Sequence, residues 1–196
     1  MQYLVSFALL VAVCAWMVGV YNHLLHLRSA VCNCWSQWLK AAHQRNECLN
    51  DFTAAFVLFM PQGDPLPRSL RRLRDDSERS LSIAPEPRWS EQHGFVNGAE
   101  LLLRQTVARS LQEVEESAVM RSHEYLQRLC SRLNVSLYQQ DQFAALFNHA
   151  VSEYNEALKT PSARLLAPLF GFMMADTIGL AGTKTPAAPD GTAGAD

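Results

Sequence analysis

The chain opens with an uncharged apolar stretch that leads without a break into an amphipathic helical pattern. Residues 3–20 contain no Asp, Glu, Lys or Arg, and nine of them are Leu, Val or Phe. A helix of about 18 residues is about 27 Å long, near the minimum that crosses the hydrocarbon core of a bilayer. These apolar side chains each favour insertion. We therefore predict a membrane-spanning helix over residues 3–20.

Three alternatives to a retained anchor are open for this stretch. A secretory signal carries basic residues before its apolar run and an A-x-A-like cleavage site after it, and this sequence has neither. A lipid-attachment site at Cys14 would need a smaller residue than Val13 before it. A buried helix of a globular core is usually shorter or has a polar face. The pattern favours a retained anchor over all three.

The residues that flank the anchor indicate its orientation. Arg28 and Lys40 follow it, whereas only the terminal amine precedes it. Positive charge close to a membrane helix tends to stay in the cytoplasm. We therefore expect a very short N-terminus outside and the rest of the chain inside. The five cysteines have no disulfide-like spacing, which agrees with a reducing compartment.

Beyond the anchor, apolar side chains recur every three or four positions up to residue 59, which is the periodicity of a helix stripe. No Gly or Pro occurs between Val20 and Met60, so we predict that the anchor continues outward as one rod. Arg45 is the one charged residue on the stripe. The apolar members of the stripe are Leu24, Leu27, Val31, Cys34, Trp35, Trp38, Ala42, Cys48, Leu49, Phe52, Phe56 and Phe59.

A Pro-rich segment of mixed charge follows at residues 61–94. It holds five of the nine prolines of the chain, together with six arginines and a similar number of carboxylates. This composition predicts a connector outside the core, with at most one short helix over residues 68–81. The arginines could hold anionic lipid headgroups, but the neighbouring carboxylates offset that attraction and favour a solvated loop.

Further helical patterns follow the connector. Residues 97–133 carry a near-heptad seam of the coiled-coil type, and residues 136–159 carry another apolar stripe. Pro161 interrupts the pattern, and Ser162 is a suitable cap for a short apolar helix over residues 163–176.

These patterns define the fold class and the domains. No strand pattern or long repeat occurs, so we predict an all-α protein with a single N-terminal transmembrane helix followed by an antiparallel bundle of long helices. The anchor covers residues 1–20 and the bundle domain residues 21–178. Residues 179–196 are rich in Gly, Ala, Pro and Thr and predict a disordered tail.

Three segments together resemble one known family. They are Tyr21-Asn22 with Leu24, Leu27, Arg28, Val31 and Trp35-Ser36-Gln37; FNHAVSEYN at 147–155; and Pro161 with Ala167 and LFGF at 169–172. In these residues the chain resembles the LemA family, as a divergent member, because Leu39, Arg45 and Asn50 stand where the family usually has an acidic residue, an Arg-Arg pair and a proline. The resemblance implies a single-pass protein of the bacterial inner membrane. It also implies a cytoplasmic bundle of long helices with no established biochemical activity.

Four residues of these segments are candidates for contacts with a partner: Trp35, Asn148, Tyr154 and Asn155. Asn148 and Asn155 are seven residues apart and share one helix face, and Asp141 extends the row. They could bind a partner or a facing helix through hydrogen bonds. Alternatively, they lie at the edge of the seam and satisfy each other or water. Tyr154 is more typical of a core ring whose hydroxyl reaches the edge of the bundle.

Cofactor binding and catalysis have little support in the sequence. Cys32, Cys34, His43 and Cys48 point in different directions and are spread over about 24 Å of helix, so they cannot converge on one metal ion. His23 and His26 share a helix face at the membrane exit and could ligate a metal or haem together with a second helix. The alternative is that both rings lie at headgroup level.

Motifs for catalysis are also missing from the sequence. It has no G-x-S-x-G elbow, and the run that begins at His123 is not the HEXXH zinc motif. We predict that the chain is not an enzyme and needs no cofactor.

The net charge of the chain bears on the class of partner. The net charge is −2, which gives no indication of a nucleic-acid partner. The sequence therefore predicts a membrane-anchored scaffold or protein-interaction module, with unknown protein partners and possible self-association. The alternative hypothesis is a cofactor-binding membrane subunit that uses His23 and His26.

Overall fold

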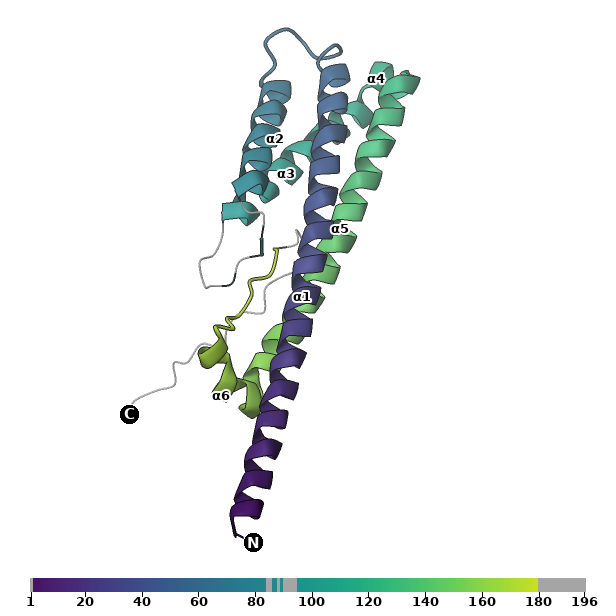
Figure 1. Cartoon of the computed structure of the whole chain (residues 1–196). Helices are drawn as coiled ribbons and strands as arrows, with labels where there is room; N and C mark the ends of the chain where they lie inside the picture. The colour runs from purple at the N-terminus through teal and green to yellow at the C-terminus, as the bar shows by residue number, and fades with distance from the viewer. Residues whose placement is uncertain (1, 84–85, 88, 90–94, 180–196) are drawn as a thin grey trace, which may run out of the picture.

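The computed structural model describes residues 2–83, 86–87, 89 and 95–179, and this part of the chain is built of helices without any strand. In chain order the helices are α1 (Gln2–Phe56), α2 (Pro65–Ile83), α3 (Phe95–Glu116), α4 (Ala118–Ser122), α5 (Glu124–Lys159) and α6 (Pro161–Phe170) (Figure 1). The predicted fold class, an all-α bundle with one long apolar N-terminal helix, is confirmed.

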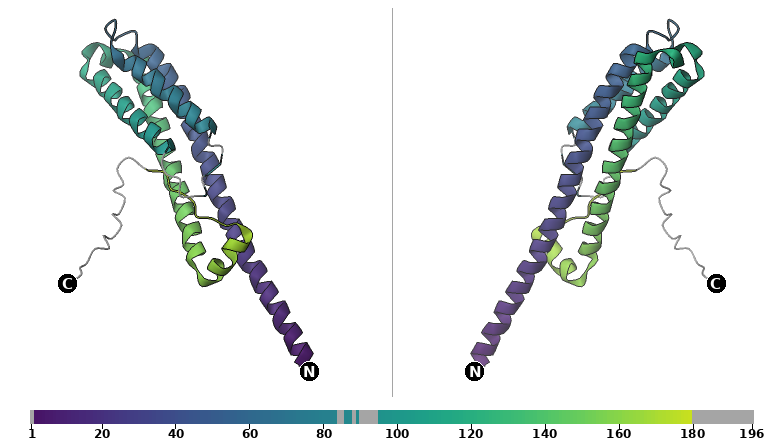
Figure 2. Two further views of the ribbon diagram at one scale, coloured as in Figure 1. Left: turned by 90° about the vertical axis from the view of Figure 1, so that its left-hand side faces the viewer. Right: turned by 90° about the vertical axis from the view of Figure 1, so that its right-hand side faces the viewer.

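Helix α1 is one continuous rod of 55 residues, about 80 Å long. Its N-terminal end projects beyond the rest of the molecule, and no residue of its most apolar 18-residue window is buried (Figure 2). This end is long and apolar enough to cross a membrane. The following part of the same helix packs into the bundle, as the absence of Gly and Pro between Val20 and Met60 predicted.

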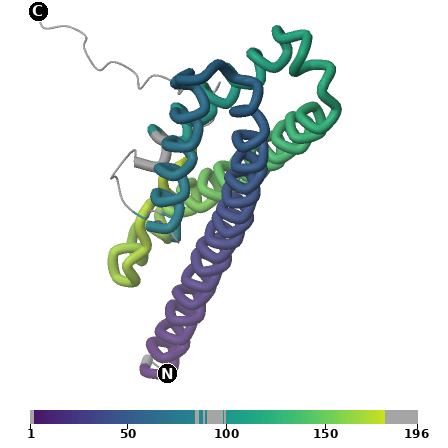
Figure 3. The backbone as a smooth tube through the Cα atoms, turned by 90° about the horizontal axis from the view of Figure 1, so that it is seen from above, coloured from purple at the N-terminus to yellow at the C-terminus, as the bar shows by residue number. Residues whose placement is uncertain are grey.

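Helix α5 runs antiparallel to α1 and forms with it the main helix pair of the bundle (Figures 1 and 2). Helices α2 and α3 pack against each other, and α2 also packs against α1. The short helix α4 lies at the far end of the molecule, where the chain turns from α3 into α5 (Figure 3). Helix α6 contacts both α1 and α5 near the projecting end.

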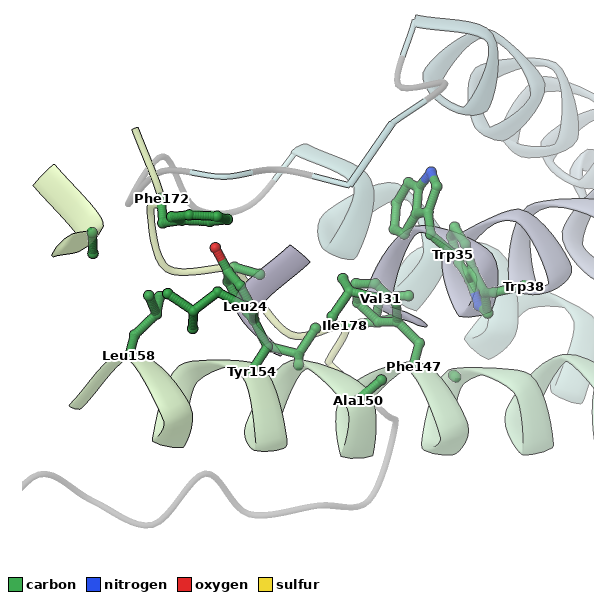
Figure 4. Close-up of a cluster of buried hydrophobic side chains, with 14 of the residues drawn as sticks. Leu24, Val31, Trp35, Trp38, Phe147, Ala150, Tyr154, Leu158, Phe172 and Ile178 are labelled. Atoms are coloured by element: carbon green, nitrogen blue, oxygen red, sulfur yellow. The ribbon is translucent and has the colours of Figure 1, made fainter. Parts of the chain in front are cut away.

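Two apolar cores lie along the α1–α5 pair. The proximal core, nearer the projecting end, gathers large side chains from both helices (Figure 4), namely Leu24, Val31, Trp35, Trp38, Phe147, Val151, Tyr154 and Leu158. The distal core includes side chains from α2 and α3 as well, namely Leu49, Phe52, Phe56, Leu66, Leu70, Leu103, Val107, Val114, Leu126, Leu129 and Leu133. The stripe predicted on α1 therefore serves both cores.

The prediction that residues 61–94 lie outside the core is wrong for residues 65–83, which form α2; the short helix allowed at 68–81 lies within it. Pro65 and Pro67 do not break this helix because they stand in its first turn, where backbone N–H groups have no helical partner. The Asp64 carboxylate accepts a hydrogen bond from the Leu66 N–H at 2.8 Å, as an N-cap does. Leu66, Leu70 and Leu81 are buried, so α2 is part of the bundle. Most of residues 84–94 lie outside the described part.

The predicted helices at 97–133 and 136–159 also need correction. The chain leaves the first of them after Glu116, and α5 then continues through residues 133–136 without a break. Ser117 and His123 adopt extended backbone conformations and cap α4 and α5 through their side chains. The chain reverses direction between these two residues. Neither of them is a strong helix breaker, so the near-heptad pattern predicted one continuous helix there.

The last helix begins and ends earlier than residues 163–176. The Thr160 hydroxyl, and not Ser162, caps it by accepting a hydrogen bond from the Ala163 N–H. Gly171 ends it in the left-handed conformation at φ 68°, and the Phe172 N–H donates to the Ala167 carbonyl at 2.9 Å. From Phe172 the described chain continues without helix to Gly179. The predicted disordered tail lies outside the described residues, apart from Gly179.

Candidate functional site

Residues 172–179, here called the C-terminal strap, are held along α5 by two asparagines. The Asn148 amide donates to the Ile178 carbonyl and accepts from the Ile178 N–H, both at 2.8 Å. The Asn155 amide makes the same pair of bonds to the carbonyl and N–H of Ala175, at 2.9 and 3.0 Å. Two side chains, spaced two turns apart on one helix face, thus bind the backbone of the strap at two points.

Tyr154 also holds the strap, and the three residues Asn148, Tyr154 and Asn155 are here called the clasp. Its hydroxyl donates to the Met173 carbonyl at 2.9 Å, and its ring meets Trp89 edge to face at 5.6 Å. Burial raises the pKa of the Tyr154 hydroxyl, which therefore stays protonated as a donor. The strap in turn places Phe172 and Ile178 in the proximal core.

The clasp accounts for three of the four residues that the sequence offered for partner contacts. Asn148 and Asn155 bind the chain's own strap, which is neither of the arrangements that the sequence suggested. Tyr154 is the core ring that the sequence favoured, and its hydroxyl also binds the strap. Asp141, the third member of the predicted row, forms an ion pair with Arg104 instead. The sequence did not identify the strap, because the apolar pattern predicted that residues 172–176 belong to the last helix.

Trp35, the fourth candidate, is a core residue. Its ring packs on Trp38 at 4.9 Å and on Phe147 at 5.3 Å (Figure 4). The indole N–H groups of Trp35 and Trp38 are both buried without a hydrogen-bond partner among the described residues. Trp35 therefore contributes packing area between α1 and α5.

A second polar arrangement, here called the polar layer, lies between the two apolar cores and consists of Arg45, Asn46, Ser77, Glu100 and Gln140. Arg45 is fully buried, between Ala42 of the proximal core and Cys48 of the distal core. Its guanidinium forms an ion pair with Glu100, with one hydrogen bond to Oε1 at 2.9 Å. The layer joins α1, α2, α3 and α5 through side chains alone.

Every member of the polar layer has hydrogen-bond partners. Arg45 also donates to Ser77 Oγ at 3.0 Å, to Gln140 Oε1 at 3.1 Å and to Asn46 Oδ1 at 2.8 Å. Ser77 and Gln140 donate in turn to the Glu100 carboxylate, at 2.7 and 3.2 Å. A buried charge is tolerated when it is paired and its remaining donors and acceptors are satisfied, and the layer meets both conditions.

The electrostatics of Glu100 follow from this environment. Burial alone would raise the pKa of the carboxyl group. The attraction of Arg45 and the hydrogen bonds from Arg45, Ser77 and Gln140 outweigh that effect, so the pKa lies below its usual value. The Arg45–Glu100 pair is therefore charged at neutral pH.

The polar layer continues to the surface through Asn46 and Glu78. Asn46 Nδ2 donates to Glu78 at 2.6 Å, and His43 Nδ1 lies 2.8 Å from the other oxygen of the same carboxylate. These groups border an open polar cavity of about 720 Å³ between α1 and α2, which Arg74 and Asp51 also line. The pairing orients the His43 ring, and each of these polar groups has a partner within the protein.

The two histidines of the cofactor hypothesis lie on the surface of α1. His23 and His26 are both exposed, and His23 borders an apolar groove of about 420 Å³ beside α6. Across the described part of the chain, no three His, Cys, Asp or Glu residues are grouped so that they could hold a metal ion. Cys32, Cys34 and Cys48 are free thiols. Cofactor binding by His23 and His26 remains a prediction that a metal analysis and an optical spectrum would test.

Glu100, Gln140 and Ser77 were missed by sequence reasoning, although one signal pointed to them. Arg45 stood alone on an apolar stripe, so a buried counter-charge was required. Glu100 precedes Leu103 and Val107 by three and seven residues, and Gln140 precedes Ala144 and Phe147 by four and seven. Both therefore lie in register with the buried faces of their helices.

Comparison of the chain with protein-family models, with curated proteins and with solved structures gives no match. The resemblance to the LemA family therefore rests on the three segments quoted above.

Proposed function

We propose that this chain is a LemA-like scaffold or protein-interaction module that a single N-terminal helix anchors in the bacterial inner membrane. The observation that carries the proposal is the continuity of α1. Its exposed apolar end and its bundle-forming part belong to one helix of 55 residues without a linker. A membrane-embedded end would therefore hold the bundle at a fixed orientation to the bilayer. The resemblance to the LemA family implies the same arrangement.

The packing at the end of the apolar stretch supports a retained anchor over a cleaved signal. Leu24 is buried in the proximal core, and Val20 and Tyr21 pack against that core. The Tyr21 ring contacts Phe170 at 4.8 Å and Phe172 at 5.8 Å. Cleavage near Val20 would cut a helix within its packed region, whereas signal peptides are released from an accessible segment.

The polar groups of the interior support a scaffold over a ligand-binding protein. The asparagines of the clasp and the polar layer are occupied by contacts within the chain. By contrast, one face of α5 carries an exposed stripe of three apolar side chains, Val135, Tyr138 and Leu146, with the exposed Gln139 and Gln142 between them. Exposed apolar groups that line up on a helix are typical of protein-binding surfaces. We propose this stripe as the surface that binds partners or another copy of the chain.

The orientation proposed is the one that the flanking charges favour. Arg28 and Lys40 lie on the bundle side of the apolar stretch, and α1 has no carboxylate before Glu47. The bundle is then cytoplasmic. A reporter fused to the C-terminus that is active only in the cytoplasm tests this topology.

Membrane fractionation combined with cross-linking tests the proposal. Wild-type protein should resist alkaline carbonate extraction, and cross-linking in intact membranes should capture partners or a second copy. Leu9→Arg together with Leu10→Arg should release the protein from the membrane. Val135→Glu together with Leu146→Glu should leave it in the membrane but abolish cross-linked products.

Val119→Glu is the matched surface control, because Val119 is even more exposed than Val135 and Leu146 but lies on α4. It should change neither the membrane fraction nor the cross-linked products. Wild-type protein that is extracted by carbonate, or that stays a solitary monomer under all cross-linking conditions, would contradict the proposal.

A further inference from the structure

The end of the bundle next to the anchor is built by the turn from α5 to α6. An apolar groove there is lined by Trp16 and Gly19 of α1 on one side and by Thr160 and Ser162 on the other. The turn therefore reaches as far along α1 as the last residues of the apolar stretch. Figure 2 shows α6 beside α1 at the level where α1 leaves the bundle, and the contact of Tyr21 with Phe170 gives the same placement.

Five large apolar side chains are exposed on this end of the bundle: Leu165, Leu169, Phe170, Met173 and Met174. They are here called the base patch, and their exposed fractions are 69%, 73%, 46%, 53% and 50%. Ala163, Leu166 and Ala167 of α6 face inward, so α6 has one apolar face on the core and, with Leu165 and Leu169, a second one directed away from it. Single exposed apolar residues are common, but a cluster of this kind marks an interaction surface.

The charges around the base patch are balanced. From residue 156 to residue 176 the charged residues are Glu156, Lys159, Arg164 and Asp176, so acidic and basic groups are equal in number. Arg164 is exposed within α6, while Lys159 pairs with Glu156 at 2.7 Å. Trp16 and Tyr21 lie at the same level of α1, and aromatic side chains of these two kinds are enriched at the membrane–water interface.

We propose that the base patch is a second membrane contact, in which α6 and the start of the strap insert their apolar side chains between the headgroups of the bilayer that α1 crosses. The inference rests on the proposed membrane anchoring and names the bilayer lipids as the partner of this surface. Apolar side chains inserted to headgroup depth beside basic residues are the usual arrangement of interfacial helices. Two contacts, one spanning and one interfacial, would prevent the bundle from tilting about the anchor.

Site-specific photocross-linking to lipid tests this inference. The full-length protein is reconstituted into nanodiscs of phosphatidylcholine and phosphatidylglycerol, with benzoylphenylalanine at one position in each sample. The test position is Leu165. The control position is Val119, which is 68% exposed and lies on α4 at the other end of the bundle. A third sample carries the probe at Leu10, within the apolar stretch.

After irradiation, mass spectrometry identifies the adducts. We expect lipid adducts at Leu165 and Leu10 and none at Val119. Lipid adducts at Leu10 but not at Leu165 would overturn the base-patch inference and leave the anchor intact. Lipid adducts at neither position would overturn the anchor as well. Protein adducts between two copies at Leu165, without lipid adducts, would identify the base patch as a self-association surface and also overturn the inference.

Discussion

Arg45 is fully buried, and its guanidinium has hydrogen-bond partners on α1, α2, α3 and α5. A buried ion pair contributes little net stability compared with a well-packed apolar core, because both charges lose their hydration. Removing one member is much more costly, since the other stays buried and unpaired. We therefore interpret the polar layer as a device that selects one axial register of the four helices over registers that would leave Arg45 unpaired.

Neutralising Glu100 should destabilise the protein strongly. Glu100→Gln keeps the shape of the side chain but leaves the Arg45 charge without its counter-charge, at a cost of about 3–5 kcal/mol in the free energy of unfolding. Urea unfolding of the detergent-solubilised full chain, followed by circular dichroism at pH 7, measures the change. Glu47→Gln is the control, because Glu47 is exposed two residues from Arg45 and should change stability by less than about 0.5 kcal/mol. Equal effects of the two variants would contradict the role given to the layer.

The same pair makes stability depend on pH in a defined direction. The pKa of Glu100 is lower in the folded protein than its value of about 4.3 in an unfolded chain. Its contribution is therefore complete above about pH 4.3 and is lost as the pH falls through the lower folded-state pKa. The difference in unfolding free energy between wild type and Glu100→Gln should shrink over that acidic range.

At the scale of elements, the strap is an extended segment that completes a helical core. The described part of the chain offers its backbone no strand to pair with. The amides of Asn148 and Asn155 take the place of a neighbouring strand, because each bonds both to the N–H and to the carbonyl of one strap residue. Backbone N–H and carbonyl groups that become buried need hydrogen-bond partners within the protein. The clasp therefore lets Phe172 and Ile178 enter the proximal core.

Removing either asparagine should loosen the strap and leave the helices unchanged. Asn148→Ala and Asn155→Ala each delete two hydrogen bonds, at a local cost of about 1–2 kcal/mol. This cost corresponds to about 5- to 30-fold faster amide exchange under conditions where the opening equilibrium sets the exchange rate. Hydrogen–deuterium exchange of the peptide that contains Ala175 and Ile178 measures this effect. Asn134→Ala, on the exposed face of the same helix, is the matched control. Unchanged protection of the strap in both clasp variants would show that packing alone holds it.

At the scale of the whole molecule, α1 and α5 run through both apolar cores and the polar layer between them. Two rigid helices shared by two cores couple them, because neither core can open without disturbing the other. The tryptophans offer a way to observe this coupling. Trp35 and Trp38 lie in the proximal core and Trp89 packs against it, whereas the distal core has none.

A cavity made in the distal core should therefore lower the urea midpoint that the fluorescence of tryptophans in the proximal core reports. Phe52→Ala removes a fully buried ring from the distal core and should cost about 3–5 kcal/mol. We expect tryptophan fluorescence and circular dichroism to report the same lowered urea midpoint. Leu58→Ala, at an exposed position past the end of α1, should leave both unchanged. A shift in circular dichroism without a shift in fluorescence would show two independent units.

The predictions from the sequence succeeded where the pattern is local and failed where a boundary depends on distant contacts. The rod of α1 followed from an apolar stripe without Gly or Pro. Helix α2 was predicted too short and outside the core because Pro65 and Pro67 suggested a loop, although prolines in a first turn are compatible with a helix. The reversal at Ser117 and His123 was missed because side-chain caps there replace the usual breakers.

The amino-acid sequence by itself determined the helical class, the apolar stretch of membrane-spanning length and the buried faces of most helices. These properties follow from the order of apolar and polar residues within a few turns, which acts at short range along the chain. The tertiary structure alone decided that Arg45 pairs with Glu100 and Gln140, and that Asn148 and Asn155 bind the strap. Those partners are separated by 20 to 95 residues. Only the packing of α5 against α1, of α2 against α1 and α3, and of the strap against α5 brings them within hydrogen-bond distance.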